Sequence, residues 1–191
     1  GGALPTSGGP AMSQEVGPPA VVSSASLSGP AASATLVLPP HSTGVWQHYY
    51  PAIIHDHPEL ELDETRLKQN PKQFQHVFAR IVQRWITDSH DPPGIESWRA
   101  FRSRIGAGLN TIMRQQGSGK NVMIFTSAGP VATAVQMATG MPDDRCIGIS
   151  WQVLNASTTR FRYNEKEMTL VGFNDVAALE RQGDPGLLTY R

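Results

Sequence analysis

The pattern of apolar and polar positions is sharpest around a short apolar run, Val122 to Phe125, which ends at small residues and Pro130. A helical pattern resumes over residues 131–139. The run is typical of a strand buried on both faces, and the whole pattern predicts a strand, a tight turn and a helix. In an open α/β sheet such a turn lies at the carboxyl edge of the strands, where free N–H groups of the helix can face an anion. We therefore expect a functional site at Thr126 to Gly129.

Two longer helices are predicted before this strand. Asn70 and Pro71 form a typical helix start, and apolar residues then recur three and four positions apart. A second periodic segment ends at Gly117, a residue type that commonly terminates helices. These signals predict helices over residues 71–87 and 97–116 that flank a central strand.

Other elements are shorter. Residues 45–57 predict a short helix or a pair of turns, and residues 143–147 a short helical piece. Three later segments have the composition of strands, and the last two are predicted to form a hairpin around a polar loop at 164–167. The three segments are 149–154, 158–163 and 168–173. Together with the helices they predict the α/β class.

The first 44 residues differ in composition from the rest. Of these, 29 are Gly, Pro, Ser or Ala, and Glu15 is the only charged residue. Such a low-complexity segment lacks the apolar surface for a core, so we expect residues 1–44 to be poorly ordered and to make few contacts with a domain at 45–191. Residues 20–23 and 35–38 could form weak strands, which neighbouring prolines would confine to sheet edges.

Charge and cysteine content narrow the class of protein. The 16 basic and 16 acidic residues balance, so no global field favours nucleic acid or an anionic membrane as a partner. Cys146 is the only cysteine, which excludes an intrachain disulfide and a cysteine-based zinc site. No apolar segment reaches the roughly 18 residues needed to span a bilayer, and no signal-peptide pattern opens the chain. We expect a cytoplasmic protein without metal or cofactor.

Five blocks of residues, in the order in which they follow one another, carry a resemblance to a known family. The blocks are 94–104, 122–131, 151–157, 173–175 and 188–191. In this order they resemble the carboxyl half of the histidine phosphatase superfamily, the phosphoglycerate-mutase-like fold. The resemblance covers residues 45–191 and implies a three-layer α/β domain, incomplete at the N-terminus, with a pocket for a phosphorylated small molecule. In that family a histidine of an Arg-His-Gly motif accepts the phosphoryl group, a second histidine and arginines hold it, and an acidic residue protonates the leaving oxygen.

The chain departs from this pattern in three places. It has no Arg-His-Gly motif, and the low-complexity segment stands where that motif is expected. Where the family has Ser or Thr, His, Gly, Gly, this chain has Thr126, Ser127, Ala128 and Gly129. A serine can hydrogen-bond phosphate but cannot carry the charge of a histidinium. The acidic proton donor is expected just before Tyr49, where residues 41–44 contain no carboxylate.

One acidic residue does carry over from the resemblance. Glu96 and Ser97 match the family's Gly-Glu-Ser block, although Ile95 separates Glu96 from Gly94. We treat this glutamate as a neighbour of the pocket and assign no catalytic residue. The candidate phosphate-pocket residues are Glu96, Thr126, Ser127, Ala128 and Gly129.

Several motifs have simpler interpretations. A nucleophile elbow has a glycine before its serine, and Ser127 lacks this glycine. If the family resemblance is left aside, a serine that caps the following helix is the better interpretation. His55 and His57 could bind a metal from one strand face, but a polar loop is favoured. Residues 117–120 resemble a P-loop but precede the strand, so we predict a plain loop. A solvated helix face is predicted for Arg99, Arg102 and Arg104.

Two functions remain open at this point. The first is a phosphohydrolase-type enzyme by descent, whose nucleophile is lost or supplied by other sequence. The second is a non-catalytic remnant: a binding or interaction module, or a truncated or frame-shifted gene product whose first 44 residues are not family sequence. In either case we expect little or no turnover of phosphomonoesters, because no histidine stands in the family's motif.

Overall fold

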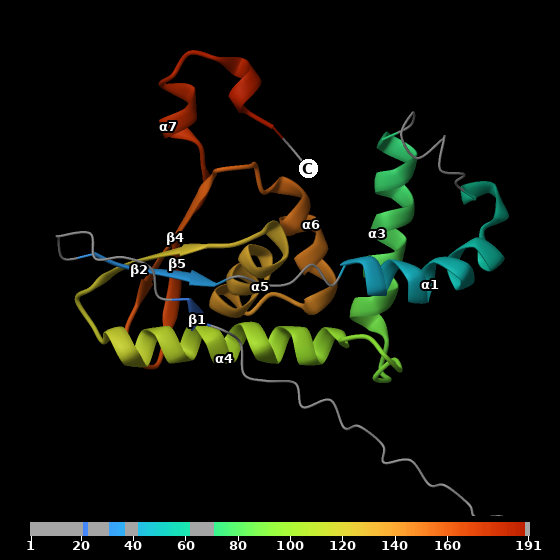
Figure 1. The fold of residues 1–191 in the computed structure, drawn as a ribbon, viewed down its shortest axis with the longest axis horizontal. Coiled ribbons are helices and arrows are strands. Elements are labelled where there is room, and N and C mark those ends of the chain that lie inside the picture. Colours follow the sequence, from blue (N-terminus) through green and yellow to red (C-terminus); the bar gives the residue numbers. More distant parts are fainter. Residues whose placement is uncertain (1–20, 23–30, 37–41, 62–70, 190–191) are drawn as a thin grey trace, which may run out of the picture.

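The computed structural model describes residues 21–22, 31–36, 42–61 and 71–189. The first half comprises β1 (Val21–Val22), β2 (Ala31–Leu36), α1 (Ser42–Asp56), the 3-10 helix η1 (Pro58–Leu60), α3 (Pro71–Thr87) and α4 (Trp98–Gln116). The second half comprises β3 (Asn121–Phe125), α5 (Ala128–Thr139), η2 (Asp143–Arg145), α6 (Cys146–Gln152), β4 (Thr158–Tyr163), β5 (Met168–Asp175), α7 (Ala177–Glu180) and η3 (Pro185–Leu187). Figure 1 shows the helices and strands interspersed along the chain, so the predicted α/β class is confirmed.

Helix α3 has the predicted bounds, and α4 begins one residue later than predicted. Helix α3 begins at Pro71, and α4 begins after Ser97, whose hydroxyl accepts a hydrogen bond from the Ala100 N–H at 3.3 Å. Gly117 ends α4 with a φ of 68°, and its N–H donates to the Met113 carbonyl. A glycine tolerates this backbone conformation without the steric cost that a side chain would add.

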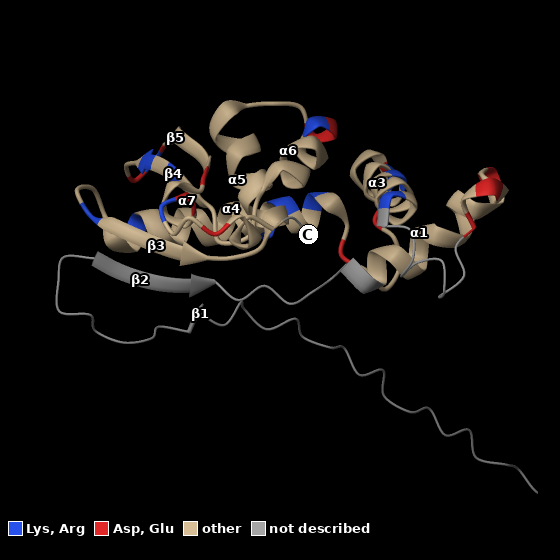
Figure 2. Cartoon of the chain, turned by 90° about the horizontal axis from the view of Figure 1, so that it is seen from above, with Lys and Arg blue, Asp and Glu red and all other residues tan. Residues whose placement is uncertain are grey.

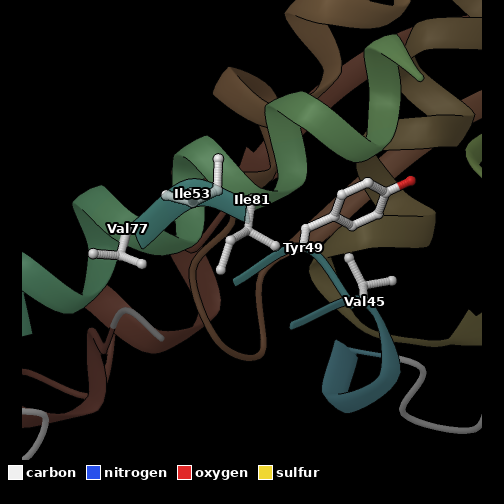
Figure 3. Packing of buried hydrophobic residues seen from close by; sticks show 5 residues of the cluster. All are labelled: Val45, Tyr49, Ile53, Val77 and Ile81. Carbon is white, nitrogen blue, oxygen red and sulfur yellow. The ribbon is translucent and has the colours of Figure 1, made fainter. Parts of the chain in front are cut away.

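The first hydrophobic core lies between α1 and α3. Three residues of α1 and two of α3 are almost completely buried, and Figure 3 shows their side chains facing one another. They are Val45, Tyr49, Ile53, Val77 and Ile81. A second cluster joins the end of α3 to α4, α5 and α6 through Ile86, Trp98, Ala132 and Cys146. The helices are therefore held by two cores that meet along α3.

Tyr49 adds a polar contact to the first core. Its side chain is 3% exposed, and its hydroxyl donates to Asp88 Oδ2 at 2.9 Å. Burial, followed by this hydrogen bond, raises the pKa of Tyr49 to about 12. The backbone N–H of His90 and the Tyr49 hydroxyl hold the pKa of Asp88 below its usual range. The contact fixes α1 to the carboxyl end of α3.

We expect the protein to lose stability in alkali through Tyr49. The folded state favours the neutral phenol, so its contribution is present below pH 10 and is lost as the pH rises from 10 to 12. The shift from 10 to about 12 corresponds to a loss of about 3 kcal/mol in the free energy of unfolding. Urea denaturation of wild type and Tyr49→Phe at several pH values tests this. The wild-type advantage should shrink across this interval, and an advantage that stays constant would contradict the assignment.

Strand β3 does not occupy the predicted position. In the three-stranded sheet the order is β1, β2, β3, so β3 lies at the end of the described sheet. It pairs in parallel with β2 from Asn121 to Phe125. Met123 is 57% exposed and Phe125 is 58% exposed, so the prediction of a central strand buried on both faces is wrong. The physical reason is that no described element covers the face that carries these two side chains.

A second correction concerns residues 149–154, which form no strand. Residues 146–152 are the helix α6, and residues 153 and 154 lie beyond its end. Ile149 packs against the same cluster as Cys146, three residues earlier, which is helical spacing. The following hairpin is confirmed: β4 and β5 pair in antiparallel fashion around residues 164–167. In its loop, the Asn164 side chain accepts hydrogen bonds from the backbone N–H groups of Lys166 and Glu167.

The predictions for residues 1–44 can be compared with the structure only in part, because most of these residues lie outside the described ones. Strand β1 falls within the predicted weak strand 20–23, and β2 overlaps the second one at residues 35–36. However, β2 lies between two strands, not at an edge, and its pairing with β3 is a contact with the domain that was not expected. In the part of the chain that is described, no helix is long and apolar enough to cross a membrane.

Candidate functional site

The predicted strand, turn and helix around residue 127 are present. Strand β3 ends at Phe125, two residues follow, and α5 begins at Ala128. The Val131 N–H donates to the Ser127 carbonyl at 3.3 Å, and the Thr133 hydroxyl donates to the Gly129 carbonyl at 2.9 Å. Residues 117–120 form the turn before β3, as predicted.

Ser127 is at the N-cap position of α5, yet its side chain makes no capping hydrogen bond. The interpretation of this residue as a helix-capping serine is therefore wrong. Pro130 has no N–H, so Ala128 and Gly129 supply the remaining free donors of the first turn. The amino end of α5 thus presents two N–H groups and the Ser127 hydroxyl, donor types that suit an anion.

Glu96 is held by Arg104 in a bidentate ion pair. Both nitrogen–oxygen distances are 2.7 Å, and the side chains of Glu96 and Arg104 are only 17% and 23% exposed. The Glu96 carbonyl accepts from the Trp85 indole N–H at 2.8 Å. The prediction of a solvated face is thus wrong for Arg104, because its guanidinium, on α4, pairs with the carboxylate of Glu96, which lies eight residues earlier and just before the helix.

Phe101 connects this ion pair with α5. The Arg104 guanidinium lies 5.3 Å from the centre of the Phe101 ring, a cation–π geometry. The Cζ atom of the ring lies 3.7 Å from the position that a Cβ on Gly129 would take. Glu96 is therefore connected to the first turn of α5 through Arg104 and Phe101. Sequence reasoning missed both Phe101 and Arg104; the only signal was the spacing from Glu96.

Two further arginines of α4, Arg99 and Arg102, lie beside an open hollow. Arg102 donates to Gln136 at 3.0 Å and lies 3.5 Å from Asp143, while Arg99 pairs with Asp91. The hollow has a volume of about 550 Å³ and contains none of the predicted site residues. Its lining residues are Arg99, Arg102, Ser103, Gly106, Ala107, Asn110, Met137 and Asp143.

The described histidines and Cys146 make their contacts with residues other than those of the turn at 126–129. The five described histidines form hydrogen bonds or ring contacts with residues of α1, η1, α3 or residues 88–89. His55 and His57 belong to no cluster of three metal-binding side chains within the described ranges. Cys146 is buried, and burial raises the pKa of its thiol to about 11, so it stays protonated at neutral pH. None of these contacts involves Ser127.

The sequence that builds this site matches a protein-family model. A model of the histidine phosphatase superfamily (branch 1) matches residues 54–176. The chain belongs to the histidine phosphatase superfamily. The matched range extends from the end of α1 to the end of β5 and includes Glu96, Ser127 and the other candidate pocket residues. No curated protein and no solved structure matches the chain.

This histidine phosphatase domain differs from the pattern of its family in two features. The family's pocket is expected to use imidazoles, but Ser127 occupies the position where the resemblance places the second histidine. Glu96 is also unlike a free proton donor, because Arg104 engages both of its carboxylate oxygens. The two candidate segments are brought together, but without an identified nucleophile.

Proposed function

We propose that this histidine phosphatase domain binds phosphorylated small molecules at the amino end of α5 but does not hydrolyse them. The observation that carries the proposal is the state of Ser127: it lies at the helix N-cap, and its hydroxyl accepts no bond from the helix. That hydroxyl and the N–H groups of Ala128 and Gly129 can donate to phosphate oxygens. The protein is then a binding-competent pseudoenzyme, which we place in the cytoplasm, where a lone buried Cys146 needs no disulfide partner.

The lack of turnover follows from the chemistry of phosphoryl transfer. Covalent catalysis needs an activated nucleophile in line with the leaving group, and a proton for the leaving oxygen. The sequence has no Arg-His-Gly motif, and the interactions of the described histidines stay within the α1–α3 region and residues 88–89. Arg104 donates to both carboxylate oxygens of Glu96, and the geometry assigns this carboxylate no role beside a leaving oxygen.

The proposal predicts weak phosphate binding and no hydrolysis. Purified protein should bind inorganic phosphate with a roughly millimolar dissociation constant, because only a few hydrogen bonds hold it. Ser127→Ala should weaken binding by roughly 2- to 10-fold, the loss of one neutral hydrogen bond. Ser118→Ala is the matched control, since Ser118 is exposed and precedes β3 at its opposite end. Binding can be followed by NMR shifts of the Ala128 and Gly129 amides, and hydrolysis with 4-nitrophenyl phosphate.

Two results would overturn this function. Robust hydrolysis that is abolished by Ser127→Ala, or by the loss of one histidine, would show that the chain is an active enzyme. Complete absence of phosphate binding would instead favour the alternative, a remnant without a ligand at this position. Ser127→His provides a positive test, because an imidazolium formed near pH 6 should tighten phosphate binding without restoring turnover.

A further inference from the structure

The hollow beside α4 shares no lining residue with the candidate site at the amino end of α5. Its described lining comes mainly from one face of α4, where residues three and four positions apart follow one another from Arg99 to Asn110. Met137 of α5 and Asp143 of η2 complete the described lining. The volume of about 550 Å³ suits a small organic molecule.

A buried glutamine fixes the position of Arg102 in this hollow. Gln136 is only 4% exposed, and its Oε1 accepts a hydrogen bond from Arg102 Nε at 3.0 Å. The amide nitrogen of Gln136 donates to the Met141 carbonyl and to Asp143 Oδ1, each at 2.9 Å. The glutamine therefore cannot turn away without losing three hydrogen bonds, and Arg102 is anchored through its Nε.

The two terminal nitrogens of Arg102 form no hydrogen bond within the described part of the chain. Its ion pair with Asp143 also runs through Nε, at the longer distance of 3.5 Å. Both oxygens of Asp143 already accept shorter bonds, from Trp98 at 2.8 Å and from Gln136 at 2.9 Å. The Arg102 side chain is 43% exposed, so the donors on its terminal nitrogens are accessible to a ligand.

The charges around the hollow favour an anion. Two arginines, Arg99 and Arg102, stand against one aspartate in the described lining, which leaves a net charge of +1. The helix α4 contains four arginines and no acidic residue (Figure 2). Arg99 is paired with Asp91, but both side chains are well exposed, so this ion pair is weak and can open for a ligand.

We propose that this hollow binds a small organic anion, with its phosphate or carboxylate group on Arg102 and its apolar part against Gly106 and Met137. A guanidinium with two free terminal nitrogens can donate to two oxygens of such a group at once. Arg99 and the Ser103 hydroxyl line the same hollow and supply further donors. The site is separate from the amino end of α5 and adds a second anion-binding function to the domain.

NMR titrations of the isotope-labelled full chain with phenyl phosphate, benzoate and inorganic phosphate test the proposal. All three should shift the backbone amides of Ser103 and Asn110, and the two aryl anions should bind more tightly because they also use the apolar part of the hollow. Arg102→Gln should weaken each by roughly fivefold or more, since hydrogen bonds to a charged group contribute more than neutral ones. Tighter binding of phenyl phosphate or of benzoate identifies which oxyanion the hollow takes, and either supports the proposal.

Gly106→Ala probes the apolar part of the hollow. Its Cβ would lie 3.0 Å from Met137 Cε, the flexible end of a side chain, and alanine favours the helix, so the variant should fold. The added methyl group narrows the hollow, so it should weaken the two aryl anions and leave inorganic phosphate unchanged. Equal binding of all three anions to Gly106→Ala and wild type would contradict the assigned position of the apolar part.

Arg114→Gln is the matched control for Arg102→Gln, because Arg114 is exposed on the same helix and does not line the hollow. It should bind all three anions like wild type. Equal weakening by the two substitutions would overturn the proposal. So would the absence of shifts at Ser103 and Asn110 up to about 50 mM anion, well above a millimolar dissociation constant. The amides of Ala128 and Gly129 report on the α5 site separately, and Arg102→Gln should leave their response unchanged.

Discussion

Replacement of Ile81 by alanine is expected to lower the free energy of unfolding by about 2–5 kcal/mol. Ile81 is 0% exposed and packs with Val77, Val45, Tyr49 and Ile53 in the core between α1 and α3. The substitution removes buried methyl and methylene groups and leaves a cavity that rigid helices only partly refill. Because small domains are stable by only about 5–15 kcal/mol, a loss of this size is a large part of the total. Urea denaturation of the purified variant measures it.

Gln75→Ala is the control for this experiment. Gln75 lies on the same helix, but it is exposed and does not belong to the core cluster. Its replacement should change the free energy of unfolding by no more than about 0.5 kcal/mol. If Ile81→Ala behaved like Gln75→Ala, α1 and α3 could not pack through this cluster in solution.

Local signals in the sequence determined the helix boundaries well. Pro71 starts α3, Ser97 caps α4, and Gly117 and Gly140 end α4 and α5 with positive φ angles. Each signal acts through the backbone of its own few residues, so it needs no knowledge of the rest of the fold. For the same reason the hairpin around Asn164 was predictable: its turn is closed by hydrogen bonds within four residues.

Burial and tertiary partners were harder to predict. The apolar run at Val122 to Phe125 correctly indicated a strand, but whether Met123 is covered depends on elements elsewhere in the chain. Residues 149–154 were mistaken for a strand because a short apolar segment fits periods of both two and about 3.6. Here the contact of Ile149 with the cluster around Cys146 favours the helix.

The candidate site shows the same division between local and distant information. The turn at Thr126 to Gly129 was located from the change of pattern between strand and helix, which is a local signal. The contact of Arg104 with Phe101 is local to α4, because the two residues lie three positions apart on that helix. Only the approach of the Phe101 ring to Gly129 requires α4 to pack on α5. The resemblance to histidine phosphatases pointed to Glu96 but gave no indication of its partner Arg104.

Removal of either charge of the Glu96–Arg104 pair is expected to cost about 3 kcal/mol in the free energy of unfolding. The pair is bidentate and mostly buried, so Glu96→Gln or Arg104→Met leaves the remaining charge desolvated and without its partner. Arg104→Met also removes the guanidinium from the Phe101 ring. The double variant should lose less than the sum of the single variants, with a coupling energy of about 1–3 kcal/mol.

The matched control is the Arg84–Asp56 pair, which also joins an arginine to a carboxylate, at 3.2 Å, but whose side chains are 49% and 50% exposed. Solvent screens such a pair, so its coupling energy should be no more than about 0.5–1 kcal/mol. Denaturant unfolding of both double-mutant cycles gives the comparison directly. Equal coupling in the two cycles would mean that Glu96 and Arg104 are solvated in solution. A larger coupling for Glu96 and Arg104 would identify this pair as a fixed support beside the first turn of α5, whatever ligand that turn binds.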